Sequence, residues 1–564
     1  MLSKLTPLGW KLLQEDCDLL VGEYLFRPPW ILLISVLVGL FLWRIVRRAR
    51  GEELDRLASR LTENHRFVAV ILALGTALAS WWVNVRVLGG LPHTQDEIAY
   101  LFQARTLASG RLFLDPLPDG LEQALSTVFL VHDNGRWYGK YPFGWPLVLS
   151  FGCLIGCEAI VNPITNALAL VLFHGFLCRH GSAGWALTGS FLLACSPFFV
   201  LMGASFLSQP LTLLLFLGLL WCHDLAWEEA REWDSRNGQI ASRPDRIAVW
   251  TGLLTAMLVT VRPFDALVLS VPICLPLVCG WIAQRRFRTV VVLIVASACG
   301  VALTLAYNQA LTNDPFLTPF LKYSAGDRPG FGPRVGTFDP EGHNLYKGVL
   351  NLTFNTLVLN EDLFGWPSIG VVVVLLGLIL PATWSRVERV VLACCAGIYL
   401  LYFCFMGHGL AFGARYYHVL LPAYVWFTLR AFDELVRRFG ERMVLWLRVI
   451  VPFLCLIAFS TYYPGRLAWL EDYWDVLSRP RALLSRYGEE PAVVVVPALK
   501  VRGFRDLYDS FFSLNVPGSK GSSRIFVRDG PWTRTEVFRR AFPGRRIVTL
   551  ELDASVRDRL TGGR

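Results

Sequence analysis

Two adjacent carboxylates are the sharpest chemical signal in this sequence. Asp96 and Glu97 lie in the segment HTQDEIAY (93–100), directly after an apolar run. One carboxylate can act as a general base while its neighbour holds a ligand or a cation. A structural role is the alternative, because Asp96 is also a good N-cap for an amphipathic helix running to about Ser109. We therefore predict Asp96 and Glu97 as catalytic residues, with Tyr100 beside them on that helix.

Cations stand at comparable positions, next to apolar runs. Lys140 lies in GKYPFGWP (139–146), whose prolines, glycines and aromatic residues indicate a turn into a half-inserted helix. A lysine at headgroup depth can bind a lipid phosphate, and an interface lysine among aromatic residues can equally be a membrane anchor. Arg262 and Arg415 suit a phosphate because a guanidinium is always charged and forks. The alternative for Arg262 is an ion pair with Asp265, three residues further on.

Further candidates are polar residues near the same ends of the apolar runs, where ionisable and polar groups are costly and often functional. The predicted substrate-binding residues are Tyr100, Tyr141, Gln209, His408 and Tyr416. No cofactor is predicted. The adjacent carboxylates permit a divalent cation and do not require one, and the spacing of His93 and His132 fits no zinc pattern. The sequence contains no P-loop, no G-x-S-x-G and no Rossmann fingerprint, so it gives no support for nucleotide chemistry.

Composition places all these residues in a membrane protein. The 564 residues are 54% hydrophobic and 17% charged, against about 25% charged in soluble domains. A net charge of +10 could suggest nucleic acid, but the arginines form short clusters between apolar runs, as membrane topology requires. The 13 cysteines lie mostly in or beside apolar runs and indicate no disulfide framework. The predicted fold class is an α-helical polytopic membrane protein.

About twelve apolar runs are long enough to cross roughly 30 Å of hydrocarbon. They are 30–46, 67–89, 163–179, 185–201, 210–227, 248–262, 264–283, 289–311, 367–384, 389–407, 417–433 and 444–463. A further stretch, Pro142 to Val161, decides the orientation. If it dips in and returns, the arginine clusters fall on one side, as the positive-inside rule prefers. The outer side then carries the loops 90–162 and 312–366, the turn 407–416, the tail from about residue 464 and the first 28 residues.

The tail differs in composition from the rest of the chain. PAVVVVP (491–497), RIFVRD (524–529) and RRIVTLELD (545–553) are β-branched runs between glycine and proline turns, which is typical of strands. WTRTEVFRRAF (532–542) has helical spacing. We therefore expect two parts, a membrane domain over residues 1–463 and a small extracytoplasmic α/β module over 464–564.

Together these motifs resemble the GT-C glycosyltransferases. The resemblance covers about residues 67–463 and is nearest to the protein O-mannosyltransferase and lipid A aminoarabinose transferase superfamily. It rests on Asp96-Glu97 after an early span, a long outer loop, Lys140-Tyr141-Pro142, and Gly-Ala-Arg415-Tyr-Tyr before a late span. The sequence departs from the family pattern in having Lys-Tyr-Pro-Phe-Gly for Lys-Pro-Pro, and in lacking a second acidic residue around Gln209.

The resemblance implies an enzyme of the cytoplasmic membrane, with its site on the outer face. It would transfer a sugar from a polyprenyl-phosphate donor to a glycan, lipid or protein acceptor. Asp96 would be the general base and Glu97 its partner, while Lys140 and Arg415, with Arg262 as a further cation, would hold the carrier phosphate. A one-step displacement predicts inversion at the sugar carbon, and a covalent glycosyl-carboxylate route is the alternative. The rival functions are a transporter or flippase of a lipid-linked or anionic substrate, and a non-catalytic assembly subunit.

Overall fold

The computed structural model describes most of the chain. The described residues are 27, 30–48, 52–117, 120–235, 243–336, 341–471, 473, 477, 480, 483, 491–499, 506–515 and 524–552. The predicted outer segment before residue 29 lies outside them apart from Arg27, as do residues 236–242 of the loop 228–247, which the positive-inside rule predicts on the inner side.

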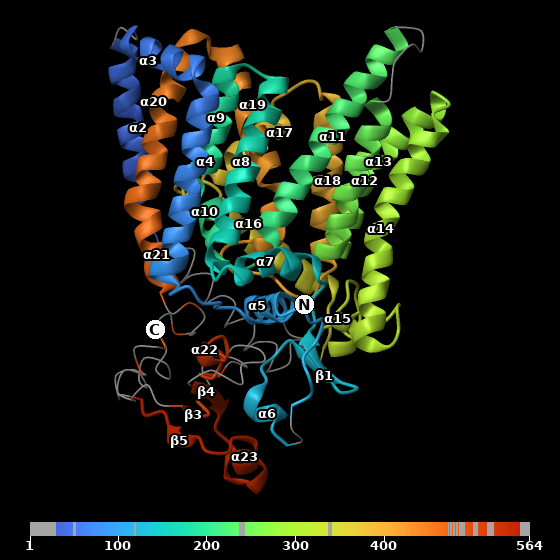
Figure 1. The fold of residues 1–564 in the computed structure, drawn as a ribbon. Coiled ribbons are helices and arrows are strands. Elements are labelled where there is room, and N and C mark those ends of the chain that lie inside the picture. The colour runs from blue at the N-terminus through green and yellow to red at the C-terminus, as the bar shows by residue number, and fades with distance from the viewer. Residues whose placement is uncertain are drawn as a thin grey trace.

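Long apolar helices lie side by side in a bundle that makes up most of the molecule (Figure 1), and 71% of the described residues are helical. The helices of the bundle are α2 (Trp30–Arg48), α4 (His65–Trp82) with its continuation η3 (Val83–Val87), α8 (Val161–His180), α9 (Ala183–Cys195), α10 (Pro197–Ala204), α11 (Gln209–Ser235), α12 (Arg243–Val261), α13 (Pro263–Ala283), α14 (Phe287–Thr312), α16 (Leu345–Asp362), α17 (Gly370–Ile379), α18 (Arg386–Phe403), α19 (Leu421–Phe439) and α20 (Glu441–Ile457), which continues through η6 (Ala458–Tyr462) into α21 (Tyr463–Leu470). Six of the described helices are long and apolar enough to cross a membrane, or seven if α9 and α10, bent by 54°, form one span. The polytopic helical class is therefore confirmed, and the count of about twelve spans stays a prediction.

One helix of the bundle was not expected. The region 312–366, predicted as an outer loop, contains the 18-residue helix α16, which packs against α17 and α18. Its apolar pattern is interrupted by Lys347, Asn351 and Asn355, so no continuous apolar run marks it. Asn355 is buried and its side-chain amide donates to the carbonyl of His408 at 2.7 Å, so this polar residue has a partner inside the protein.

Glycine permits a close helix contact between α12 and α14. A Cβ added at Gly300 would stand 2.4 Å from the carbonyl oxygen of Ala256, and one at Gly252 would stand 2.4 Å from Cβ of Ala296. Small residues at such positions let two helix backbones approach closely, which favours helix association in lipid. The break between α12 and α13, where Arg262 lies, therefore follows directly on a closely packed pair of helices.

Short elements gather at the lower end of the bundle in Figure 1. They are α5 (Gln95–Ala108), α6 (Glu122–Leu125), β1 (Leu130–Asp133), β2 (Arg136–Gly139), α7 (Gly144–Leu154), η4 (Glu158–Ile160), α15 (Pro319–Tyr323) and η5 (Arg415–Leu420). β1 and β2 form an antiparallel hairpin whose turn residues, Asn134 and Gly135, both have positive φ, as a two-residue hairpin turn requires. The opposite end carries α3 (Glu52–Glu63) and the turns from α13 to α14 and from α19 to α20 (Figure 1). At or beside these two turns lie the arginine clusters Arg285, Arg286 and Arg288, and Arg437 and Arg438.

The stretch predicted to dip into the membrane forms α7. Its 11 residues would rise only about 16 Å, roughly half of the hydrocarbon thickness, so this helix cannot cross by itself. Figure 1 shows α7 near the lower ends of the long helices, where it packs against α5. The chain therefore enters and leaves this stretch at the same end of the bundle.

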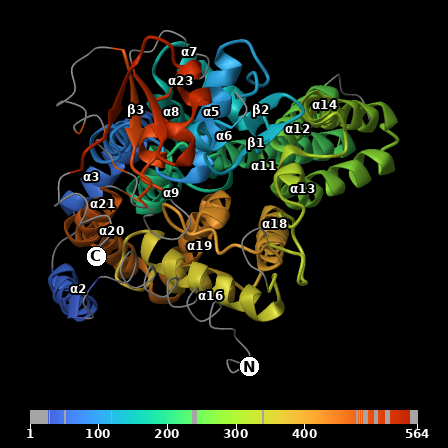
Figure 2. The ribbon, with the colours of Figure 1, turned by 90° about the horizontal axis from the view of Figure 1, so that it is seen from below.

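The described part of the tail contains a three-stranded parallel sheet in the order β4-β3-β5. Its elements are β3 (Ala492–Val496), α22 (Asp509–Phe512), β4 (Arg524–Arg528), η9 (Pro531–Arg534), α23 (Glu536–Ala541) and β5 (Arg546–Thr549). Val493, Val527 and Phe538 pack with Leu121 and Ala124 in one buried cluster. The sheet is thus docked on the 90–141 region, and Figure 2 shows it against α5 and α6.

Candidate functional site

The candidate site is built around the first turn of α5. Thr94 is the N-cap of this helix, and its side chain accepts a hydrogen bond from the backbone of Glu97 while the Glu97 carboxylate bonds back to Thr94. Such a reciprocal capping box satisfies donors that the helix start leaves open. The prediction that Asp96 caps the helix is therefore wrong, since Asp96 lies inside the first turn and its side chain is free of the capping task. The helix is also buried on nearly every side rather than amphipathic.

The Glu97 carboxylate is fully engaged by protein groups. One oxygen accepts from the Phe206 backbone at 2.7 Å, and the other accepts from the Thr94 backbone at 2.8 Å, the Thr94 hydroxyl at 3.0 Å and the His93 backbone at 3.1 Å. The residue is 1% exposed. Glu97 thus ties the start of α5 to the turn before α11. Its carboxylate and that of Asp96 have no partner in common among these contacts.

Asp96 points instead to a cation and a phenol. Its Oδ2 accepts from Nη1 of Arg415 at 2.9 Å, and its Oδ1 accepts from the hydroxyl of Tyr141. Burial alone would raise the pKa of the Asp96 carboxyl, but Arg415 and the Tyr141 hydrogen bond outweigh it and hold the pKa below its ordinary value. Asp96 is 18% exposed and Arg415 is 12% exposed, so a ligand can approach the pair from one side.

A strained turn sets the position of Arg415. Gly413, two residues earlier, has φ of +119°, and a Cβ there would stand 2.6 Å from Oδ2 of Asp362 and 2.7 Å from the ring of Phe198. Only glycine fits both the backbone and the space. The turn delivers Arg415 to the start of η5, facing α5.

Arg262 lies nearby with its own acidic partner. Its Nε donates to Oδ2 of Asp265 at 2.6 Å, and its Nη2 donates to the Tyr402 hydroxyl, which donates in turn to Asp265. The Tyr416 ring stacks on Tyr402 with centroids 4.2 Å apart. The guanidinium carbons of Arg415 and Arg262 lie 5.3 Å and 5.9 Å from the Tyr416 ring centroid. The two arginines therefore flank one aromatic ring, and the alternative role of Arg262, an ion pair with Asp265, is present in the structure.

Tyr100 and Ser208 link the two arginine sites. The Tyr100 hydroxyl lies 3.4 Å from Oγ of Ser208, which also lies 3.4 Å from Nη1 of Arg262. The Tyr100 ring packs against Tyr141 with centroids 4.5 Å apart. Burial raises the pKa of Tyr100 to about 12, so this phenol keeps its proton at neutral pH.

Lys140 is buried and paired rather than exposed as an interface anchor. It is 3% exposed, and its Nζ lies 2.7 Å from Oδ2 of Asp327. The Nζ also lies 3.7 Å from the ring centroid of Phe129 and 4.5 Å from that of Phe320. Burial lowers the pKa of Lys140, and Asp327 opposes that effect. Because Tyr141 follows Lys140, this ion pair stands next to the Asp96 site.

Gln209 and His408 lie at the edges of this arrangement. Gln209 follows Ser208 at the start of α11 and is 5% exposed; its side-chain oxygen has no hydrogen-bond partner among the described residues. Nδ1 of His408 accepts from the Leu410 backbone at 3.0 Å and so shapes the turn before Arg415. The structure brings neither side chain into contact with the Asp96 carboxylate within the described residues.

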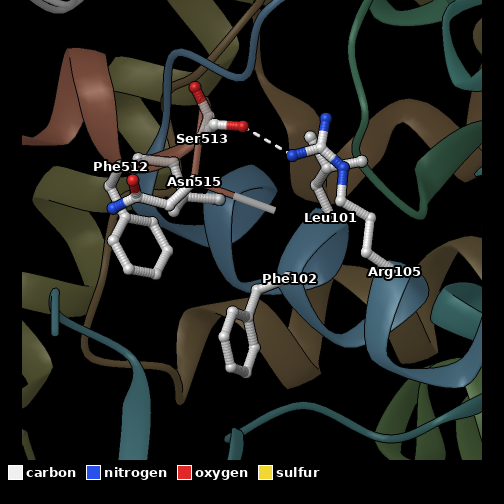
Figure 3. Close-up of a pocket in the computed structure, with 7 residues that line it drawn as sticks. Leu101, Phe102, Arg105, Phe512, Ser513 and Asn515 are labelled. Carbon is white, nitrogen blue, oxygen red and sulfur yellow. Dashed lines mark hydrogen bonds between the residues drawn. The ribbon is translucent and has the colours of Figure 1, made fainter. Parts of the chain in front are cut away.

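The other face of α5 contacts the tail. Figure 3 shows Phe102 and Arg105 of α5 facing Phe512, Ser513 and Asn515 across a small pocket. Nη1 of Arg105 donates to the carbonyl of Ser513, and Nη2 lies 2.9 Å from the Glu158 carboxylate. The helix that carries Asp96 is thus held between the membrane bundle and the C-terminal segment.

Comparison with solved structures identifies the fold. No protein-family model matches this chain, and no curated protein matches it by sequence. The crystal structure of ArnT from Cupriavidus metallidurans bound to undecaprenyl phosphate matches with a TM-score of 0.50 and 14% identity, over 85% of this chain and 89% of that one. The apo form of the same protein gives a TM-score of 0.49 at 14% identity, over the same shares of the two chains. AglB from Archaeoglobus fulgidus, in complex with an inhibitory peptide and a dolichol-phosphate, gives 0.44 at 12% identity, over 83% of this chain and 64% of that one.

At this level of identity the match to ArnT establishes the fold. ArnT is a GT-C membrane glycosyltransferase, and the predicted resemblance to that superfamily is confirmed at the level of the fold. The chain is a multi-pass membrane protein of this architecture.

Sequence reasoning missed the residues that come from distant segments. Asp327 and Tyr402 each complete an ion-pair network, but they lie 187 and 140 positions from the cations they contact. The only signal for Asp327 was an acidic residue in a predicted outer loop, and Tyr402 lies inside an apolar run. The sequence alone therefore does not show which cation either residue contacts.

Proposed function

We propose that this protein transfers a sugar from a polyprenyl-phosphate donor to an acceptor hydroxyl at the membrane surface. One observation carries the proposal: a partly exposed carboxylate, Asp96, is held by Arg415 and Tyr141 where α5 meets the bundle, in a fold shared with ArnT. The ArnT crystal structure contains undecaprenyl phosphate, a lipid of the class that such a donor would release. The acceptor is a glycan, a lipid or a protein.

The reaction requires one bond to form and one to break at the anomeric carbon. The acceptor oxygen attacks that carbon, the bond from the carbon to the phosphate oxygen breaks, and the acceptor proton passes to Asp96. The leaving polyprenyl phosphate takes the electron pair and gains negative charge, which nearby cations stabilise. A single displacement inverts the configuration of the sugar carbon.

Every proposed phosphate-binding cation is paired with a carboxylate in the structure. Arg415 pairs with Asp96, Arg262 with Asp265, and Lys140 with Asp327. A donor phosphate must therefore compete with a carboxylate at each cation. Only at the Arg415 pair does this competition release a group that the reaction needs, because the carboxylate set free is the proposed base.

This exchange would make Asp96 a better base when the donor is bound. Arg415 is a main cause of the depressed pKa of Asp96. As the guanidinium turns to the phosphate, that influence weakens and the proton affinity of Asp96 rises toward its ordinary value. The proposal thus couples donor binding to activation of the acceptor.

Orientation follows from the arginine clusters. The clusters between α13 and α14 and between α19 and α20 lie at the end of the bundle opposite α5, and the positive-inside rule assigns that end to the cytoplasm. We infer that the site faces the outer side of the cytoplasmic membrane, where polyprenyl-linked sugars are used. The docked C-terminal segment would then lie on the same outer side as the site.

The test is transfer or hydrolysis by purified protein with a panel of polyprenyl-phosphate sugars, compared with the Asp96→Asn variant. Asparagine keeps size and most hydrogen bonds but cannot accept the proton, so turnover should fall by roughly 10²–10⁴-fold, the usual worth of general acid–base catalysis. Asp115→Asn is the matched control, because Asp115 is in the same loop, is 84% exposed and pairs only with Arg111 among the described residues. Release of polyprenyl phosphate by the wild type supports the proposal. Equal turnover by Asp96→Asn contradicts the role of Asp96.

A further inference from the structure

Three metal-ligating side chains meet at the other end of the bundle. They are His65 at the start of α4 and His174 and Cys178 on α8. His174 and Cys178 are four residues apart and therefore share one face of their helix. Their ligand atoms and that of His65 all lie within 4.8 Å of one another. The proposed transferase chemistry uses none of the three.

The distances suit a tetrahedral zinc ion. Zn–N bonds of about 2.0–2.1 Å and a Zn–S bond of about 2.3 Å put ligand atoms about 3.3 Å (N to N) and about 3.6 Å (S to N) apart. Sγ of Cys178 lies 3.5 Å from Nε2 of His174 and 3.7 Å from Nδ1 of His65. The two nitrogens lie 2.9 Å apart, a hydrogen bond that a small ring rotation would open to admit the ion.

A supporting hydrogen bond fixes the tautomer of His174. The Ser190 hydroxyl donates to the Ala186 carbonyl at 2.9 Å, so its lone pairs are left to accept. Nδ1 of His174 lies 2.9 Å from this oxygen and therefore carries the proton, which leaves the Nε2 lone pair aimed at His65 and Cys178. Metal-binding histidines usually donate their second ring nitrogen to such a partner, and His174 and Ser190 are 4% and 0% exposed.

We propose that His65, His174 and Cys178 bind one zinc ion and so tie the start of α4 to the end of α8. Nε2 of His174, Nδ1 of His65 and the Cys178 thiolate are three ligands, and water from the half-exposed side of the cluster completes the tetrahedron. On binding, the Cys178 thiol releases its proton to solvent and the His65 proton moves to Nε2. One proton is therefore released for each ion bound.

This site is distinct from the carboxylate site. α4 and η3 together span 23 residues, roughly 35 Å at 1.5 Å per residue, between His65 and the segment that leads to α5. The ligands are also softer than carboxylates, which selects zinc over magnesium or calcium. Removing the metal should therefore leave the Asp96 geometry intact.

The experiment titrates metal-free, reduced, purified full-length protein with zinc against a chromophoric chelator. Cobalt serves as a spectroscopic probe because a thiolate ligand gives it a charge-transfer band in the near ultraviolet. We expect one tight zinc per chain, about one proton released, and a cobalt–thiolate band in the wild type. Cys178→Ser should abolish the band and the tight binding. Ser190→Ala removes the hydrogen-bond partner that keeps the proton of His174 on Nδ1, and it should weaken zinc binding by about 10–100-fold.

Two variants control for placement and folding. Cys279→Ser removes an exposed cysteine of α13, and His180→Gln removes a histidine near the cluster that pairs with Asp224. Both should bind zinc like the wild type. His65→Asn changes a half-exposed ligand and serves if Cys178→Ser does not fold, as judged by thermal unfolding. No binding by the wild type, or an unchanged cobalt–thiolate band in folded Cys178→Ser, would overturn the proposal.

Discussion

The exchange Glu97→Gln tests whether the second carboxylate of the pair is structural. Glu97 receives one hydrogen bond on one oxygen and three on the other. Glutamine has one oxygen and one NH₂ group, so one side of the site must lose its acceptor. The less costly orientation points the NH₂ at the Phe206 backbone and keeps the three bonds from Thr94 and His93.

The cost can be worked from these four bonds. The bond from Phe206 is charge-assisted and is lost, at about 1.5–3 kcal/mol, and its buried N–H then faces another donor. The three remaining bonds lose the charge of their acceptor and become roughly half as strong. We expect a total loss of about 3–5 kcal/mol of unfolding free energy, a large fraction of the roughly 5–15 kcal/mol typical of a domain.

The assay compares thermal or denaturant unfolding of Glu97→Gln and wild type in the same detergent, with turnover measured well below the unfolding transition. Glu122→Gln is the control, since Glu122 is in the same loop and accepts one bond, from Gly120 at the surface. It should change stability by no more than about 0.5 kcal/mol. Folded Glu97→Gln should keep turnover within roughly tenfold of wild type, unlike Asp96→Asn. Unchanged stability together with a catalytic loss as large as that of Asp96→Asn would refute the structural assignment.

Three further predictions follow from the same contacts. Asp96 must be ionised to act, and Arg415 lowers its pKa. Wild-type activity should therefore stay flat from neutral pH down to about pH 4, the ordinary aspartate range, and fall below it. In Arg415→Gln the acid limb of the kcat/KM profile should move to higher pH, and an unmoved limb would rule out Asp96 as the titrating group. Lys140→Ala should weaken donor binding and turnover together, and its double variant with Arg415→Ala should be less than additive in a donor-binding assay if both touch one phosphate. Cysteines introduced at 181–184 should resist a membrane-impermeant maleimide in intact cells, and labelling from outside would invert the orientation.

Local sequence patterns predicted most of the long apolar helices, while the roles of the site residues stay predictions. Apolar runs mark most of the bundle because lipid demands a continuous apolar surface. The positive-inside rule favoured a stretch 142–161 that does not cross, and α7 with its 11 residues is indeed too short to cross. α16 escaped because its buried asparagines have partners inside the protein, which hydropathy cannot register.

The electrostatics of the site could not be read from the sequence in the same way. The adjacent carboxylates suggested a shared function. Neighbouring residues of a helix point in different directions, however, so Asp96 and Glu97 contact different partners. Thr94 at the cap, rather than Asp96, decides this, and the deciding contact of Glu97 is a backbone N–H 109 positions away. The zinc-ligand cluster is similarly hidden, because His65 and His174 are also separated by 109 positions and only the packing of α4 on α8 joins them.

The resting ion pairs also bear on which lipids the site can use. A buried cation without a partner is costly, so Arg415, Arg262 and Lys140 can be kept near the membrane surface only because each has a carboxylate beside it. A lipid with a neutral head group has nothing to offer a guanidinium in exchange for Asp96, and it would leave the proposed base tied to Arg415. A phosphate offers a second anion with matching geometry and sets the carboxylate free. Under this proposal, discrimination in favour of phosphate-linked donors arises in the same step that prepares Asp96 to accept a proton.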